Sequence, residues 1–426
     1  MGKITTDKNQ LVLDLVETLL LSGLKDEVIF LVEMLKKNEP ICFSLSAIYA
    51  DLKGTVPDNS ANEGIAFPNR RCEIESLQGW SQRNNAKAKF QLACALYDKG
   101  HYSDAAGLWS EVSDNDYRAA RNLAAAYYTH LGRKNDVLPM LKKALSLSSG
   151  NEQLVFETAY VMGRTGVDPI ERLSFLNSQS NNITRDDVVL EWTRAYNMAG
   201  KEDEAIKLLE GRDFVPCEGG EHAVAEQYMM AYYLKGRKYM SENKLEDAIE
   251  CFRKAQTLPK NLGAGLWNTV KLVPYKYYEG LCLKSLGQIA RANENFKYIT
   301  EFEIDYFSDM HLRELPYYQA LSWREMGHGY EGDMLINNKL REWQGAINTQ
   351  DAGYFSASPF FLSYCDDAKQ SRTAYYSYLM ALAYDYTQNT EMRDKYFYQA
   401  KINDPYALNI FAEDMYKKTF NLKCCR

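Results

Sequence analysis

Two glutamates stand close together near the middle of the chain, where they could share one chemical task. Glu218 and Glu221 lie three residues apart, with Gly219-Gly220 between them and His222 directly after. A pair of carboxylates can act as general acid and base, bind a sugar or hold a cation. Alternatively, the acids favour the positive N-terminal end of a following helix and the glycines form its turn. Both interpretations stay open at this point.

Two loops around the same helical hairpin contribute further candidates. Arg212 opens the first loop, where it either bridges to these acids or is a surface residue ending the preceding helix. Asn261 opens the second loop, which runs to Gly265. This loop lacks the Lys-Ser/Thr of a phosphate-binding loop and follows a helix, so we interpret it as a glycine-shaped connection after Pro259. We predict Arg212 and Asn261 as binding residues, together with Glu218, Glu221 and His222.

The other reactive side chains form no complete catalytic or metal-binding set. The five histidines do not pair with Cys or His at metal-ligand spacing, and only His222 lies beside acids. Cys217 has no local base pattern, so we interpret it as a packed residue. A Gly-x-Ser-x-Gly elbow does not occur. The sequence therefore predicts a protein that is not an enzyme, with no cofactor and no metal.

Composition narrows the class of protein. The chain has 426 residues and a formal net charge of −7, so we expect neither nucleic acid nor an anionic membrane as partner. Its nine cysteines include no Cys-x-x-Cys pair, and no signal peptide is evident, which predicts a reduced, cytoplasmic protein. The apolar stretch from Leu11 to Leu24 is too short for a membrane span and carries two acids.

A repeating pattern predicts the architecture that positions these residues. A unit of about 34 residues recurs, with small or apolar residues and a late glycine in a first helix, then a small residue and an aromatic or Leu in a second. The spacing resembles the tetratricopeptide repeat. The copies start near Leu92, Ala124, Ala159, Tyr196, Gly236, Gly280, Ala320 and Ala381.

This resemblance implies an all-α fold, a right-handed superhelical solenoid of tetratricopeptide-like helical hairpins. Small residues in the first helix let the two helices of a hairpin approach closely, and the aromatic fills the space between repeats. The glycine ends the first helix in a left-handed cap. Hairpins must stack, because no single hairpin buries its apolar face.

The pattern divides the chain into three segments. Residues 1–84 form an N-terminal helical extension or cap. Residues 85–300 carry tetratricopeptide-like repeats with inserted glycine-rich loops. Residues 301–426 carry divergent repeats, an aromatic insert loop and a capping helix.

Three connections are longer than the repeat requires. They span residues 212–221, 261–265 and 349–367, each between a second helix and the next first helix. Such connections project from one edge of a solenoid, and insertions on one face often mark the binding face. The third contains Tyr354-Phe355 and Phe360-Phe361, and it either folds back onto the solenoid or docks a partner domain. We therefore add Tyr354 and Phe355 to the predicted binding residues.

Runs of tyrosine recur in the later repeats. Tyr275-Tyr277-Tyr278, Tyr317-Tyr318 and Tyr375-Tyr376-Tyr378 are each spaced as on a helix. We expect most of them in the core of the solenoid and the rest on its concave face. There, flat rings with a hydroxyl would suit a peptide or a sugar.

Several motifs in the same order resemble one bacterial family. They include residues 67–70, 121–124, 212–221, 258–265 and 354–359. The chain resembles the tetratricopeptide-repeat tail of the bacterial domain-of-unknown-function family 5107, in which a mutarotase-like β-sandwich region precedes that tail. This chain has Cys217 and His222 where the family pattern has Trp and Gly, and the β-domain has no counterpart here.

From these patterns we predict a non-catalytic tetratricopeptide-repeat scaffold that binds a protein or peptide partner. The family resemblance implies an alternative, in which the repeat tail is the accessory half of a carbohydrate-active protein. The tail would then pack on or assist a mutarotase- or glycosidase-like β-domain. Its partner would be a carbohydrate or a carbohydrate-active domain.

Overall fold

The computed structural model describes residues 8–61, 67–179, 183–215, 223–265, 269–303, 312, 314–349 and 363–417. Five of the predicted binding residues lie outside these ranges: Glu218, Glu221, His222, Tyr354 and Phe355. Their roles, and the choice between capping and chemistry at the two glutamates, stay predictions. Cys217 also lies outside the described residues.

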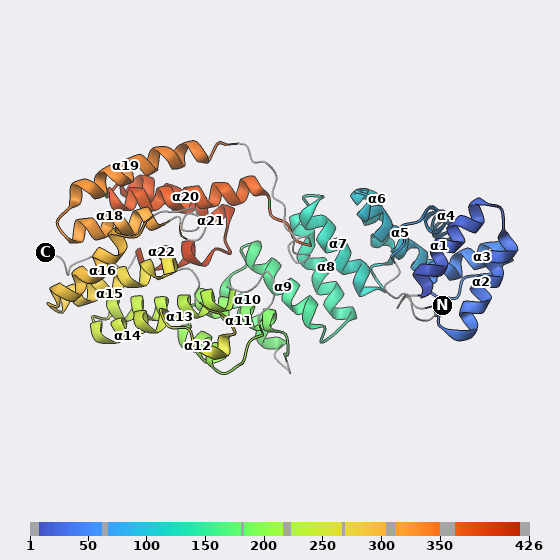
Figure 1. Cartoon of the computed structure of the whole chain (residues 1–426), viewed down its shortest axis with the longest axis horizontal. Coiled ribbons are helices and arrows are strands. Elements are labelled where there is room, and N and C mark those ends of the chain that lie inside the picture. The colour runs from blue at the N-terminus through green and yellow to red at the C-terminus, as the bar shows by residue number, and fades with distance from the viewer. Residues whose placement is uncertain are drawn as a thin grey trace. The chain divides into compact units, whose positions relative to one another are not determined.

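The chain forms two compact units, Met1–Ser149 and Gly150–Arg426. Every regular element in the described residues is helical, which confirms the predicted all-α fold (Figure 1). The predicted segment boundaries near residues 84 and 300 differ from this division and remain a prediction. Unit 1 contains α1 (Lys8–Leu21), α2 (Lys25–Asn38), α3 (Phe43–Lys53), α4 (Arg71–Gln82), α5 (Ala86–Asp98), α6 (Tyr102–Val112), α7 (Tyr117–Thr129) and α8 (Lys134–Leu147).

In the described residues, unit 2 contains six helical hairpins followed by a single helix. Its helices are α9 (Glu152–Arg164), α10 (Pro169–Ser178), α11 (Asp186–Met198), α12 (Glu202–Glu210), α13 (Ala223–Ser241), α14 (Leu245–Ala255), α15 (Val273–Ser285), α16 (Ile289–Thr300), α18 (Leu315–Glu325), α19 (Gly329–Ala346), α20 (Ala368–Tyr386), α21 (Thr390–Asn403) and α22 (Leu408–Lys417). Two short 3₁₀ helices, η1 (Lys260–Leu262) and η2 (Thr269–Leu272), lie in the connection between α14 and α15.

All eight predicted repeat copies are helical hairpins. They are α5–α6, α7–α8, α9–α10, α11–α12, α13–α14, α15–α16, α18–α19 and α20–α21. The three long connections predicted from the sequence each join a second helix to the next first helix, as expected. A fourth long connection, residues 301–314 between α16 and α18, was not predicted.

The turn inside a hairpin requires one residue with positive φ. Gly100, Gly132 and Gly287 supply it in three hairpins, with φ of 83°, 64° and 75°. Asn243 and Gln388 take this position in α13–α14 and α20–α21, with φ of 57° and 60°. The left-handed cap is therefore set by the hairpin geometry rather than by glycine alone.

Small residues in the first helices allow close helix packing, as predicted. A Cβ added at Gly236 of α13 would lie 2.7 Å from Cε1 of Phe252 in α14. The same contact recurs at Gly280 of α15, where Cε1 of Phe296 lies 2.7 Å away. Both rings are fully buried. The glycine and the ring therefore form one repeated packing unit between paired helices.

The end of unit 2 returns to its own first hairpins. Arg164 Nη1 of α9 lies 3.1 Å from Asp404 Oδ1, beyond α21. The Tyr406 hydroxyl contacts Glu191 of α11, which also pairs with the buried Arg172 at 2.9 Å. From there α22 packs against α11, α13 and α21, within the unit (Figure 1). We call this return of residues 404–417 the closing segment.

No helix in the described part of the chain is long and apolar enough to cross a membrane.

Candidate functional site

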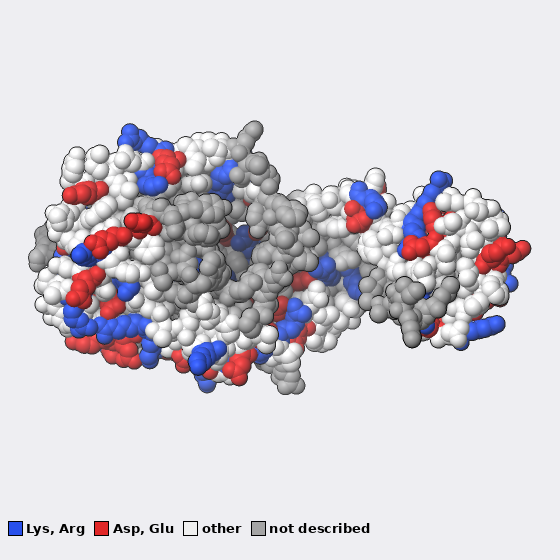
Figure 2. Space-filling view, viewed as in Figure 1, with Lys and Arg blue, Asp and Glu red and all other residues white. Residues whose placement is uncertain are grey.

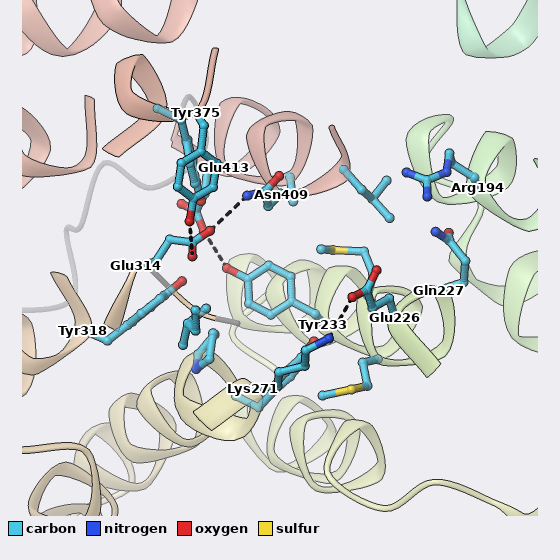
Figure 3. Close-up of a pocket in the computed structure, with 18 residues that line it drawn as sticks. Arg194, Glu226, Gln227, Tyr233, Lys271, Glu314, Tyr318, Tyr375, Asn409 and Glu413 are labelled. Carbon is cyan, nitrogen blue, oxygen red and sulfur yellow. Dashed lines mark hydrogen bonds and ion pairs between the residues drawn. The ribbon is translucent and has the colours of Figure 1, made fainter. Parts of the chain in front are cut away.

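A cavity of about 510 Å³ lies inside unit 2 (Figure 3). The first helices of five successive hairpins contribute to its wall, together with α22, Lys271 of η2, and Leu312 and Glu314 before α18. We call the surface that these first helices form the inner face of unit 2. Its lining includes Arg194 of α11, Tyr233 of α13, Tyr275 of α15, Tyr318 of α18 and Tyr378 of α20.

Helix α13 presents one continuous face to the cavity. Glu226, Met229, Met230 and Tyr233 follow each other at helical spacing, so they share one side of the helix. The two methionines are unbranched and adapt to an irregular wall. Glu226 is exposed, whereas Tyr233 is 4% exposed, so this face runs from the mouth of the cavity to its interior.

Helix α22 closes the cavity from the opposite side. Leu408, Asn409, Ala412 and Glu413 line it, again at spacings of one helical turn. The Tyr416 hydroxyl donates to the Leu234 carbonyl oxygen at 2.8 Å, which anchors the next turn of α22 to α13. A single face of α22 therefore both packs on the inner face and completes the cavity wall.

Glu413 is buried but fully compensated. The Tyr233 hydroxyl donates to Glu413 Oε1 at 2.7 Å, and Arg237 Nη1 lies 3.4 Å from the same oxygen. The Arg237 guanidinium carbon lies 4.1 Å from the centroid of the Tyr278 ring. Burial raises the pKa of Tyr233, although the Arg237 charge opposes this rise. The cluster joins α22 to α13 by a buried ion pair.

Glu314 is the second buried carboxyl of the cavity. It precedes α18 and is 7% exposed. Asn409 Nδ2 donates to its Oε1 at 2.9 Å, and the Tyr375 hydroxyl lies 3.5 Å from its Oε2. Burial raises the pKa of Glu314, the hydrogen bond from Asn409 opposes this rise, and the Glu413 charge adds to it. Within the described residues, both donors to this carboxyl are neutral.

The other charged side chains of the lining have partners of their own, other than Glu314 and Glu413. Lys271 Nζ lies 2.8 Å from Glu226 Oε1. Arg194 Nη1 donates to the Tyr406 carbonyl oxygen at 3.2 Å, and its guanidinium carbon lies 4.0 Å from the centroid of that ring. In Figure 3 the side chains of Glu314, Tyr375 and Glu413 gather at one end of the cavity, away from Arg194.

The arrangement is suited to binding. Aromatic rings, two methionines and a few fixed polar groups are the usual lining of a ligand site. In the part of the chain that the structure describes, no group of three or more His, Cys, Asp or Glu side chains is placed to hold a metal ion.

The predicted residues Arg212 and Asn261 lie together, but away from this cavity. Arg212 Nε donates to Asp186 Oδ1 at 2.7 Å, and its Nη1 lies 3.4 Å from the Ile183 carbonyl oxygen. Asn261 Nδ2 donates to the carbonyl oxygens of Leu209 and Arg212 at 2.8 and 2.7 Å. Their role in binding a partner remains a prediction.

These contacts join the two glycine-rich loops. The Phe214 amide donates to the Asn261 carbonyl oxygen at 2.8 Å, so the loops after α12 and α14 lie side by side. This agrees with the prediction that the two connections project from one edge. The third predicted loop, with Tyr354 and Phe355, lies outside the described residues.

Sequence reasoning found the tyrosines of the cavity but missed its carboxyls. Tyr275, Tyr318, Tyr375 and Tyr378 belong to the runs that were expected in the core or on the concave face, and all four line the cavity. Glu314, Asn409 and Glu413 carry no local signal, because they meet only when α22 packs inside the unit. The tyrosine runs were the one available pointer to this site.

Comparisons with known proteins find repeat proteins at low similarity. No protein-family model matches the chain. The human IFIT1 dimer with PPP-AAAA is 12% identical, with 93% of this chain and 95% of that chain covered and a TM-score of 0.31. The P58(IPK) TPR domain is 12% identical, with coverages of 80% and 99% and a TM-score of 0.23. Naa15/Naa10 bound to HypK-THB is also 12% identical, with coverages of 98% and 63% and a TM-score of 0.24.

Similarities this weak carry no detail of function over to this chain. The resemblance to domain-of-unknown-function family 5107 stays a prediction, as does the carbohydrate-related role that it implies.

Proposed function

We propose that this protein is a non-catalytic helical-repeat scaffold that binds a protein partner on the inner face of unit 2. One observation supports this proposal most strongly. The inner face already holds one amphipathic helix, α22, which packs on α11 and α13 and is hydrogen-bonded to Glu314 just before α18. A surface that recognises a helix of its own chain has the shape and chemistry to recognise a helix or strand of another.

The contacts of α22 define this mode of recognition. Apolar residues of one helix face pack into the wall, and a few buried polar groups fix the register. Here Glu413 meets Tyr233 and Arg237, and Asn409 meets Glu314. The partner then occupies the open part of the inner face, at the cavity mouth near Glu226, Met230 and Lys271.

Charge favours protein over nucleic acid as the partner. The chain carries a formal net charge of −7. Among the described residues visible in Figure 2, Lys and Arg are interspersed with Asp and Glu over unit 2. Nucleic-acid binding draws its affinity from a concentrated basic face. A mixed surface suits a polypeptide with complementary charges.

Site-specific photo-crosslinking tests the proposal. A photoreactive amino acid at Glu226 or Met230 reports on the inner face. Tyr330 of α19 and Tyr398 of α21, which are 75% and 68% exposed on second helices, provide matched outer positions. We expect the inner positions to capture a defined polypeptide in cells and the outer positions to capture none.

The captured polypeptide must then bind the purified chain directly. Titration of the purified partner should give saturable binding that Met230→Trp weakens, since the larger ring would obstruct the cavity mouth. Equal capture from inner and outer positions, or binding unaffected by Met230→Trp, would refute an inner-face scaffold.

A further inference from the structure

The cavity beside α22 is large enough for a small molecule. A volume of about 510 Å³ falls within the usual range for ligand pockets, roughly 300–1,000 Å³. Met229, Met230 and Leu408 form an apolar stretch of the wall, Glu314 and Glu413 lie at one end, and Arg194, Glu226 and Lys271 line the wall away from that end. A ligand whose polar group lies at Glu314 can therefore place an apolar body along the methionines.

Among the described residues, the end with Glu314 and Glu413 has one paired cation, Arg237, for two buried carboxyls. Glu413 has Arg237, but Glu314 receives only the Asn409 amide and the distant Tyr375 hydroxyl in the described part of the chain. A carboxyl that is 7% exposed is costly to ionise without a cation. A cationic group at this end would supply the missing counter-charge.

Tyrosine rings surround the same end. Tyr233, Tyr318, Tyr375 and Tyr378 all line the cavity. The faces of such rings carry partial negative charge and attract a cation that lies over them. An anionic ligand would meet two carboxyls and four of these rings, which excludes a phosphate or carboxylate ligand at this end.

We propose that this cavity binds the primary ammonium group of an amine whose apolar chain lies along the methionines of α13. The ammonium donates hydrogen bonds to Glu314 and packs over the tyrosine rings, while Asn409 holds the carboxyl in place. A primary amine fits better than a quaternary one, because the carboxyl accepts N–H donors. This inference is independent of the proposed protein partner.

The same ammonium chemistry occurs in free alkylamines and in lysine side chains. Isothermal titration calorimetry on the full chain distinguishes them. The probes are hexylamine, 1-hexanol as its uncharged match, hexyltrimethylammonium as its quaternary match, and the peptide acetyl-Gly-Lys-Gly-amide with its lysine-acetylated form. We expect saturable binding of hexylamine or of the lysine peptide, and at least tenfold weaker binding of each matched probe.

Two variants locate the binding. Glu314→Gln keeps the shape of the side chain and should weaken the amine roughly tenfold or more, because a charge-assisted hydrogen bond is lost. Met230→Trp should abolish binding by filling the cavity while leaving Glu314 intact. Glu391→Gln, at an exposed position of α21, is the matched control and should bind as the unchanged chain does.

Each outcome is decisive. Binding of hexylamine alone assigns the site to a free amine, and binding of the lysine peptide alone assigns it to a lysine side chain. Equal binding of hexylamine and hexanol, full binding by folded Glu314→Gln, or no binding of any amine would overturn the proposal. Failure here leaves the protein-partner proposal intact, because crosslinking at the cavity mouth tests that proposal separately.

Discussion

At the level of single residues, the packing of Gly236 against Phe252 sets how close α13 and α14 lie. A Cβ at this position would sit 2.7 Å from a ring that is fully buried and has no room to move. We expect Gly236→Ala to lower the free energy of unfolding by about 1–3 kcal/mol, the usual cost of overpacking. Urea denaturation of the variant measures this change.

Gly345→Ala is the control for this prediction. Gly345 lies in α19, and a Cβ there would meet nothing within 4 Å. Alanine should therefore be neutral or raise stability by about 0.5–1 kcal/mol, as in an open helical position. Equal losses in both variants would show that helix contact at Gly236 is not the cause.

Glu314 gives the protein a dependence on pH. Burial raises its pKa above the usual 4.5, so the folded state holds the proton more tightly than the unfolded chain. The stability that this group contributes is therefore lost as pH rises from 4.5 through the raised pKa. Glu413 of α22 and Tyr375 and Tyr378 of α20 face the same carboxyl.

The variant Glu314→Gln should remove this dependence of stability on pH, because the amide does not titrate. Urea titrations of the full chain at mildly acidic and mildly alkaline pH should show a smaller loss of stability for Glu314→Gln than for the unchanged chain. An identical pH profile for the two proteins would contradict a raised pKa at Glu314.

At the level of elements, α22 is held by a buried ion pair. Glu413 and Arg237 are each 3% exposed. Removing one partner leaves a buried charge, so Glu413→Ala should cost about 3–5 kcal/mol and release α22 first. Hydrogen exchange should show faster exchange in α22 than in α14. Glu250→Ala, which removes an exposed pair with Lys254, should change stability by less than about 1 kcal/mol.

In the turn of the α20–α21 hairpin, a substitution should raise stability rather than lower it. Gln388 has a φ of 60°, a conformation that costs a side chain about 1–2 kcal/mol and costs glycine little. We expect Gln388→Gly to raise the midpoint of urea unfolding. Thr387→Gly, at the neighbouring position with a φ of −81°, should lower it. A loss of stability in both variants would argue against strain at Gln388.

The sequence predicted the helical hairpins of this protein well. Hairpins follow from local spacing, so Gly100, Gly132 and Gly287 marked their turns correctly. The cavity depends instead on contacts between distant segments. Glu314 and Asn409 are separated by 95 residues and join only through the packing of α22. Local periodicity contains no information about that pairing, whereas the tyrosine runs flagged the wall because a buried aromatic stripe is itself periodic.

At the level of the whole molecule, the C-terminal end of unit 2 packs back onto the first hairpins of the same unit. Open repeat arrays contact only their nearest neighbours along the chain, so their stability is close to a sum of local terms. In unit 2 the closing segment adds contacts across more than two hundred residues, such as the hydrogen bond from Arg194 to Tyr406. Stability there should be shared across the unit rather than stored hairpin by hairpin.

That closure limits how unit 2 can change its length. In an open array, evolution or a protein engineer can insert or delete a hairpin, because the remaining stack simply becomes longer or shorter. In unit 2 an added hairpin would carry Tyr406 away from Glu191 and Arg194, and the ion pairs of Arg164 would be lost with it. The number of repeats between α9 and α21 is thus fixed by geometry, so this half of the protein should vary through its loops rather than through its repeat count.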